Sequence, residues 1–277
     1  MTILVTGARG KVGQAIIARL HAAGLPVRAA SANPAELTVP AGVEAVELAL
    51  DHPTGAALDG VRQVFLYPDP TGIDAFIKSA QAAGVEHVVL LSSSSVLDPD
   101  AETDPLASHS LKVEQALAAS DLVHTFLRPD AFASNALGWA YLIGQNLPIQ
   151  LAYPDADIAP IHPDDIADIA VEALTGDSLK GRAVTLTGGQ ALTFRRQLAV
   201  LSEVLGRDIP LVEITHAEAE QQMSQYMPAP MVASLLALWA AASAAPAAVA
   251  DTTQTLLGTP ARTFEQWARD NAAAFQQ

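Results

Sequence analysis

The amino-acid sequence predicts an α/β protein in which a doubly wound parallel sheet is followed by a smaller, mainly helical C-terminal lobe. Two observations favour this fold class. In the first half of the 277-residue chain, short β-branched runs alternate with alanine-rich segments of helical periodicity, which is typical of βαβ units. From Ala191 onward the pattern is mainly helical. We therefore expect a sheet domain over residues 1–187 and a smaller lobe over 188–277.

The first βα unit is the clearest of the predicted elements. Residues 3–6 form an apolar strand, and Val12 and Leu20 lie on one apolar face of a helix expected over 12–23. Gly24 then ends this helix at a position that favours left-handed backbone. The later elements of the sheet domain are expected in alternating order, as strands at 27–30, 43–48, 64–66, 87–91, 124–127 and 183–187 and as helices at 72–83, 105–119 and 164–174.

The charge and composition of the chain exclude several classes of protein. It has 30 acidic and 15 basic residues, and a formal net charge of -15 repels nucleic acids and anionic lipid surfaces. It has no cysteine, which excludes thiolate nucleophiles and cysteine metal sites. Residues 231–250 carry no charge, but their many alanines are too weakly apolar for a membrane span. We expect a cytoplasmic monomer or homodimer whose partner is a small molecule.

A glycine-rich loop follows the first strand and opens the first helix. Residues 7–13 read Gly-Ala-Arg-Gly-Lys-Val-Gly. In this position the first glycine permits a tight turn, the second lets the backbone approach a pyrophosphate, and the third lets the helix pack closely on the strand. The helix N-terminus offers N–H groups and a positive dipole to the phosphates. The sequence thus predicts a dinucleotide site formed by the loop residues Gly7, Arg9, Gly10, Lys11, Val12 and Gly13.

The end of the second strand bears on the choice between NAD(H) and NADP(H). An acidic residue there accepts the ribose hydroxyls of NAD, whereas an arginine there favours the phosphate of NADP. The segment after residue 28 offers neither, and its first acid is Glu36. Arg9, Ser31 and Asn33 are candidate donors to the extra phosphate. We therefore expect NADP(H) to be preferred over NAD(H), with a solvated surface position as the alternative for Arg9.

Several segments, in the right order, resemble the NmrA-like atypical short-chain dehydrogenases. The most specific is Thr-Phe-Leu-Arg-Pro-Asp-Ala-Phe-Ala-Ser-Asn at 125–135, and Glu114 precedes it. The other matching segments are the glycine loop at 6–13, the strand ending in serines at 84–93, and the segments at 161–167, 192–207 and 263–268. The resemblance implies an NAD(P)-binding Rossmann domain followed by a substrate-binding lobe. Members of this family include quinone or enone reductases, biosynthetic reductases and dinucleotide sensors without turnover.

The residues that would carry catalysis depart from the usual pattern of short-chain dehydrogenases. Those enzymes use Tyr-x-x-x-Lys on a helix, where the lysine lies one turn from the tyrosine and lowers its pKa. Counting back from Lys112 gives Ser108 instead of tyrosine. His109 is an alternative proton donor, and the resemblance implies that Lys112 holds the nicotinamide ribose. For both residues a solvated surface position is the competing interpretation. Ser94 is the candidate for a contact with the substrate.

Other site residues are expected from the topology, because ligands of open α/β sheets bind at the carboxyl ends of the strands. Tyr67, Ser92, Pro129 and Phe132 are predicted to flank the cofactor, and Asn135, Trp139 and Tyr226 to contact the substrate, with core packing as the alternative for the aromatic residues. No metal is expected. His162 precedes Asp164 and Asp165, but no second histidine lies at ligand spacing, so the two acids are interpreted as a helix cap.

These features predict an NAD(P)H-dependent oxidoreductase that transfers hydride to a small planar quinone, enone or carbonyl compound. Hydride transfer to a quinone can take its proton from water, so the absence of the tyrosine is less damaging for this reaction than for ketone reduction. Two alternatives stay open: a non-catalytic NAD(P)-sensing regulator of the NmrA kind, which Ser108 favours, and an isomerase or epimerase on the same fold.

Overall fold

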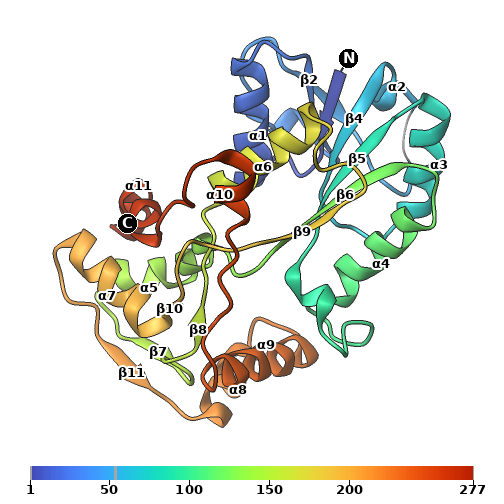
Figure 1. Cartoon of the computed structure of the whole chain (residues 1–277). Coiled ribbons are helices and arrows are strands. Elements are labelled where there is room, and N and C mark those ends of the chain that lie inside the picture. Colours follow the sequence, from blue (N-terminus) through green and yellow to red (C-terminus); the bar gives the residue numbers. More distant parts are fainter. Residues whose placement is uncertain (1, 53–54, 277) are drawn as a thin grey trace. The chain divides into compact units, whose positions relative to one another are not determined.

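A parallel sheet forms the first part of the protein. The computed structural model describes residues 2–52 and 55–276, and in these residues the sheet consists of β1 (Thr2–Val5), β2 (Val27–Ser31), β3 (Glu44–Glu47), β4 (Val61–Leu66), β5 (His87–Leu91), β6 (Val123–Pro129) and β9 (Ala183–Leu186). The strands lie in the order β3-β2-β1-β4-β5-β6-β9, and all neighbours are parallel (Figure 1). The predicted fold class is confirmed.

Helices cover both faces of this sheet (Figure 1). They are α1 (Lys11–Ala22), α2 (Gly55–Leu58), α3 (Ile73–Ala83), α4 (Ser108–Ala118) and α6 (Pro163–Thr175), with short 3-10 turns η1 (Pro34–Glu36) and η2 (Ser94–Leu97). α1 packs on α6, and α3 packs on α2 and α4. The direction of winding reverses between β1 and β4, so their carboxyl ends form the topological switch point at which ligands of such sheets bind.

The core under α3 and α4 comes from side chains at alternate strand positions. Successive residues of a strand point to opposite faces of a sheet, so residues two apart reach the same core. This core includes Leu4, Val64, Leu66, Val88, Leu90, Phe76, Val113 and Leu117, all buried. Each buried side chain of this size stabilises the fold by about 2 kcal/mol. Both faces of the sheet are covered, and all five residues of β5 are buried, so the strands stand out in the sequence as short apolar runs.

A buried polar row crosses three strands of the same sheet. The ring of His87 is fully buried, with Nδ1 2.9 Å from Gln63 Oε1 and Nε2 2.8 Å from Thr125 Oγ1. Thr125 in turn donates its hydroxyl to the carbonyl oxygen of Leu179 at 2.6 Å. Burial, aided by the positive charge of Lys180, lowers the pKa of His87 from 6.5 to about 4. The folded protein therefore holds this imidazole neutral.

We expect His87 to make the protein less stable in mild acid. Because its pKa is lower in the folded than in the unfolded chain, the unfolded chain binds more protons between those two values. Its contribution to stability is complete above the unfolded pKa and is lost as the pH falls towards the folded pKa, by about 3 kcal/mol in total. Urea unfolding at about pH 7 and about pH 5 should show a smaller difference in His87→Gln than in the wild type. The exposed His21→Gln is the control, and an unchanged difference in His87→Gln would contradict the assignment.

The second part of the protein is mainly helical. Its elements are η3 (Ala133–Trp139), α5 (Ala140–Gly144), β7 (Ile149–Leu151), β8 (Asp157–Ile158), β10 (Leu192–Thr193), α7 (Phe194–Leu205), β11 (Leu211–Glu213), α8 (His216–Met223), α9 (Ala229–Ala242), α10 (Thr252–Leu257), α11 (Phe264–Asp270) and η4 (Ala272–Phe275). Its strands form two pairs, β8 with β10 and β7 with β11. Phe264, Trp267 and Phe275 are buried at its core.

The chain divides into two compact units that are interleaved along the sequence. The first comprises Met1–Thr103, Ala107–Pro129 and Pro163–Leu186, and the second Asp104–Leu106, Asp130–His162 and Thr187–Gln277. These units differ from the continuous ranges 1–187 and 188–277 expected from the sequence, because residues 130–162 pack with the C-terminal helices. Within the described residues, no helix has both the length and the hydrophobicity that a membrane crossing requires, and α9, in the uncharged segment, is 14 residues long.

Candidate functional site

The glycine loop connects β1 to α1 with the geometry of a phosphate cradle. Gly7 has a φ of +62°, a left-handed conformation that favours glycine, and its carbonyl oxygen accepts from the N–H of Gly10 at 2.9 Å. Gly10 precedes α1 in extended conformation, and no side chain caps this helix start. The first N–H groups of α1 are thus available to an anion. These residues fit the pyrophosphate of a dinucleotide.

The first and third glycines of this loop are both tightly packed. A Cβ at Gly13 would lie 2.4 Å from the carbonyl oxygen of Gly7, so only glycine allows α1 to approach the loop this closely. A Cβ at Gly7 would lie 3.0 Å from Cβ of Tyr67, a residue that is 55% exposed. The backbone N–H of Tyr67 donates to Thr6 Oγ1 at 2.7 Å, which joins the carboxyl ends of β1 and β4. Tyr67 therefore lies against the glycine loop.

Glu36, which follows β2, forms an ion pair with Arg9 of the glycine loop that was not evident from the sequence. Arg9 Nη1 lies 3.4 Å from Glu36 Oε2, and both side chains are more than half exposed. Ser31 is the last residue of β2, and its Oγ accepts from the N–H of Asn33 at 3.2 Å. The candidate donors Arg9, Ser31 and Asn33 thus come with an acid, Glu36, that competes for the arginine.

Ser92, the first of the serines after β5, is hydrogen-bonded to a buried acid, Glu114, for which the sequence alone predicts no role. Ser92 follows the last residue of β5, and its hydroxyl donates to Glu114 Oε1 at 2.5 Å. Glu114, on α4, is 4% exposed and also accepts from Arg128 Nε at 3.0 Å and Nη2 at 2.6 Å. The hydrogen bond to Glu114 raises the pKa of Arg128. Glu114 therefore joins the carboxyl ends of β5 and β6, where Arg128 and Pro129 end the strand.

The other candidate catalytic residues lie close together in the chain. Ser94 opens η2 and is half-buried, and the hydroxyls of Ser93 and Ser95 are 2.8 Å apart. On α4, Ser108 is half-buried, whereas His109 and Lys112 are exposed. Lys112 makes no hydrogen bond or ion pair with any other residue that the structure describes. The roles of His109 and Lys112 stay predictions. Both side chains are accessible, and accessibility fits a catalytic position as well as a solvated one.

The candidate substrate residues and Phe132 belong to the second unit. Phe132 is half-buried and pairs with Ile161 in a parallel bridge, and Asn135 is exposed on η3. Trp139 packs edge-on against Phe194 with their ring centroids 6.0 Å apart, and Phe194 packs edge-on against Trp239 with their ring centroids 5.3 Å apart. This aromatic row was recognised from the sequence only at Trp139. Tyr226, in the turn after α8, is 73% exposed and lies outside the apolar clusters of this unit.

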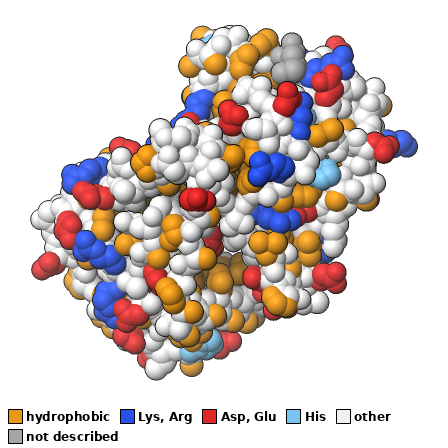
Figure 2. Space-filling model, viewed as in Figure 1, with side chains coloured by type: hydrophobic (Ala, Val, Ile, Leu, Met, Phe, Trp, Pro, Cys, Tyr) orange, Lys and Arg blue, Asp and Glu red, His pale blue; other side chains and the backbone are white. Residues whose placement is uncertain are grey.

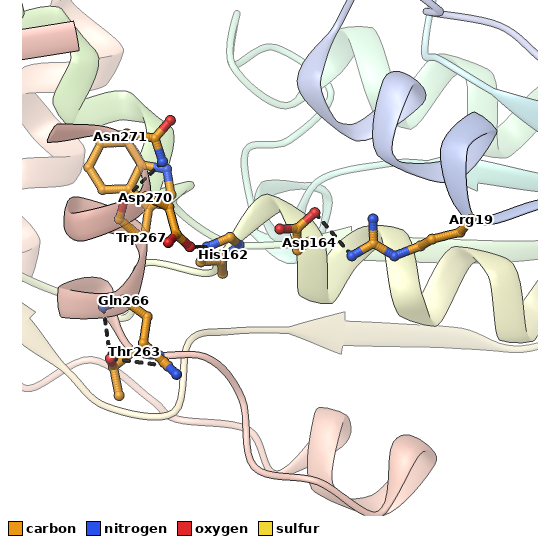
Figure 3. A network of polar contacts seen from close by, with 8 residues as sticks. All are labelled: Arg19, His162, Asp164, Thr263, Gln266, Trp267, Asp270 and Asn271. Atoms are coloured by element: carbon orange, nitrogen blue, oxygen red, sulfur yellow. Dashed lines mark hydrogen bonds and ion pairs between the residues drawn. The ribbon is translucent and has the colours of Figure 1, made fainter. Parts of the chain in front are cut away.

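The acids of α6 have a structural role in the first unit. Arg19, on α1, binds Asp164 at 3.0 Å (Figure 3) and Asp168 at 2.5 Å, so these acids fix α1 on α6. In the second unit, His162 Nε2 lies 3.8 Å from Asp270 Oδ2, and Thr263 and Gln266 form a capping box that starts α11 (Figure 3). No group of three metal-binding side chains occurs in residues 2–52 and 55–276.

Charges on the visible surface are mixed. On the face shown in Figure 2, most Lys and Arg side chains lie beside Asp or Glu. Ion pairs of this kind include Arg195 with Asp155 at 2.8 Å and Arg196 with Glu203 at 3.2 Å. This face therefore offers no broad basic patch to a nucleic acid.

Comparisons with known proteins bear on this site. A family model described as NAD(P)H-binding matches residues 7–177, which include the glycine loop and the Ser92, Glu114 and Arg128 network. The chain is 42% identical to a (4-alkanoyl-5-oxo-2,5-dihydrofuran-3-yl)methyl phosphate reductase of Streptomyces griseus over 99% of both chains. It is 33% identical to an NAD(P)H azoreductase of Xenophilus azovorans, again over 99% of both.

Solved structures show the same fold. A triphenylmethane reductase of Citrobacter sp. superposes with a TM-score of 0.81 at 22% identity and covers all of both chains. An NADPH-dependent quinone oxidoreductase of Escherichia coli superposes with a TM-score of 0.79 at 25% identity and covers 97% of this chain and 98% of that one.

Proposed function

The chain belongs to the NmrA-like, atypical branch of the NAD(P)H-binding short-chain dehydrogenases, and from this premise we propose that it reduces a small planar enone or quinone. The observation that carries the proposal is the full-length similarity to a reductase of an alkanoyl-dihydrofuranone phosphate. That name describes a ring alkene conjugated to two carbonyl groups, which is an activated enone. The azoreductase and the quinone oxidoreductase likewise act on conjugated acceptors by name.

The residues of the first unit support this chemistry. When bound, NAD(P)H supplies a hydride, and the loop residues Gly7, Gly10 and Gly13 would hold its pyrophosphate at the start of α1. Lys112 would hold the nicotinamide ribose, and Ser94 would bind a carbonyl oxygen of the acceptor. Ser108, four residues before Lys112, is a weak acid. A reduced conjugated acceptor needs only a proton from water, so Ser108 need not donate one.

Arg9 can bind either Glu36 or the extra phosphate of NADPH, and this competition would determine whether NADPH or NADH is preferred. We propose that NADPH is preferred over NADH because its extra phosphate takes Arg9 from Glu36. In Arg9→Ala, the affinity for NADPH should fall about tenfold while that for NADH changes little. In Glu36→Gln, the affinity for NADPH should rise about threefold, since an exposed pair is weak. Calorimetric titrations with both dinucleotides test this, and equal losses for both in Arg9→Ala would contradict it.

The proposed reaction is tested by the loss of nicotinamide absorbance with three acceptors: a simple quinone, an alkanoyl-dihydrofuranone, and the phosphate ester of that furanone. Turnover of any of them with NADPH supports a reductase, and the fastest acceptor identifies the substrate class. Tight dinucleotide binding without turnover of any acceptor would instead support the sensor of the NmrA kind. Ser108 favours this second function, because it stands four residues before Lys112, where the pattern Tyr-x-x-x-Lys would have tyrosine.

A further inference from the structure

The hydroxyl proton of Ser92 is already committed within the protein. Ser92 Oγ lies 2.5 Å from Glu114 Oε1, and the Glu114 carboxylate is paired with Arg128 through both of its oxygens. A carboxylate only accepts hydrogen bonds, so the hydrogen between the two side chains must be donated by Ser92. The backbone N–H of Ser92 is also used, because it donates to the carbonyl oxygen of Leu127 at 2.7 Å.

Ser92 is therefore left with acceptor capacity alone. A serine oxygen has two lone pairs, and donation of its proton leaves both of them available. The network that fixes this polarity is well shielded: the side chain of Glu114 is 5% exposed and that of Arg128 is 20% exposed. A hydrogen bond to a charged partner in such surroundings is stronger than one at the surface, so a ligand would not easily reverse it.

The position of Ser92 points to the cofactor. It follows β5, which pairs with β4, and β4 leads into Tyr67 beside the glycine loop. Ligands of open α/β sheets bind outside the carboxyl ends of these strands. A ligand group that meets Ser92 there must bring a hydrogen-bond donor. A carbonyl oxygen of the substrate brings none, whereas the carboxamide of nicotinamide has an N–H.

We propose that Ser92 accepts a hydrogen bond from the carboxamide N–H of the nicotinamide ring, and that Glu114 is the positioning residue that fixes this polarity. Ser92 is then a recognition residue for the cofactor and not a proton donor to the substrate. The assignment rests on dinucleotide binding by the family and on the nicotinamide lying at this edge, as the proposed function requires. It does not depend on which acceptor is reduced.

The test uses a dinucleotide that lacks the donor. In the 3-acetylpyridine analogue of NADP+, a methyl group replaces the amino group of the carboxamide. Wild-type protein should bind NADP+ about tenfold more tightly than this analogue in calorimetric titrations. Ser92→Ala should bind both equally, and Ser92→Thr should restore the preference because it retains the hydroxyl. Ser120→Ala, in the turn that follows α4, is the matched control and should retain the wild-type preference.

Three outcomes would overturn the assignment. A preference for NADP+ that persists in Ser92→Ala would place the acceptor elsewhere. Equal affinity of the wild type for both dinucleotides would show that the amino group is not recognised, even if Ser92→Ala weakened both. Binding of neither dinucleotide would overturn this assignment and the reductase proposal together. If the analogue preference depends on Ser92 but no acceptor is turned over, only the reductase proposal fails.

Discussion

Replacing Gly13 with alanine is expected to abolish dinucleotide binding and to lower the free energy of unfolding by about 3 kcal/mol. The new Cβ would lie 2.4 Å from the carbonyl oxygen of Gly7 and 2.9 Å from its carbonyl carbon. Both atoms are backbone, so the clash is relieved only if α1 moves away from the loop. Such a movement would displace the N–H groups that face the pyrophosphate. Calorimetric titration with NADPH and urea unfolding measure the two effects.

Gly10→Ala is the matched control for this prediction. Its Cβ would lie 3.3 Å from the same carbonyl oxygen, a distance that a small adjustment relieves. The variant should therefore fold almost as stably as the wild type while its affinity for the pyrophosphate decreases, since a methyl group would face the ligand. If Gly13→Ala bound NADPH as tightly as the wild type, or if the two variants were equally unstable, the glycine loop would not be the phosphate cradle.

Replacing Glu114 with alanine is expected to lower the free energy of unfolding by about 4 kcal/mol. The carboxylate is nearly inaccessible and accepts hydrogen bonds from Ser92 and Arg128. Its removal leaves the guanidinium of Arg128 without its counter-charge in a largely buried position, which costs much more than the pair itself contributes. Urea unfolding at neutral pH measures the loss.

The exposed pair formed by Glu203 and Arg196 provides the comparison. Its closest charged atoms are 3.2 Å apart, and the two side chains are 65% and 56% exposed. Glu203→Ala should therefore cost less than about 1 kcal/mol. Equal losses in the two variants would mean that burial does not determine the energy of the Glu114 network.

The sheet was predictable because its signals are local, whereas the errors in the element boundaries arise from contacts between residues that are distant in the sequence. The strand expected at 64–66 begins at Val61, because Gln63 is polar and yet lies inside the sheet beside His87. A buried polar row of this kind interrupts the apolar run on which the prediction depends. The helix expected from Pro105 begins at Ser108, since residues 104–106 pack with the second unit.

The candidate site was only partly predictable. The glycine loop was recognised because strand, loop and helix are contiguous in sequence. The pairs formed by Arg9 with Glu36 and by Glu114 with Arg128 join residues 27 and 14 positions apart, and nothing in their spacing indicates contact. The one signal for Glu114 in the sequence was its place on the buried face of α4. Ser110 lies four residues before it on that face, so an acid there is unusual and indicates a polar partner.

The interleaving of the two units has a consequence for biosynthesis. β6 ends at Pro129, but its neighbour β9 begins only at Ala183, after the whole of residues 130–162 has been translated. At a ribosomal rate of roughly 5–20 residues per second, β6 is an open edge for several seconds. We therefore expect the nascent chain to be prone to edge-to-edge association during that interval. A fragment truncated at residue 129 would retain the open edge permanently, so we expect it to aggregate rather than to fold as an isolated nucleotide-binding domain.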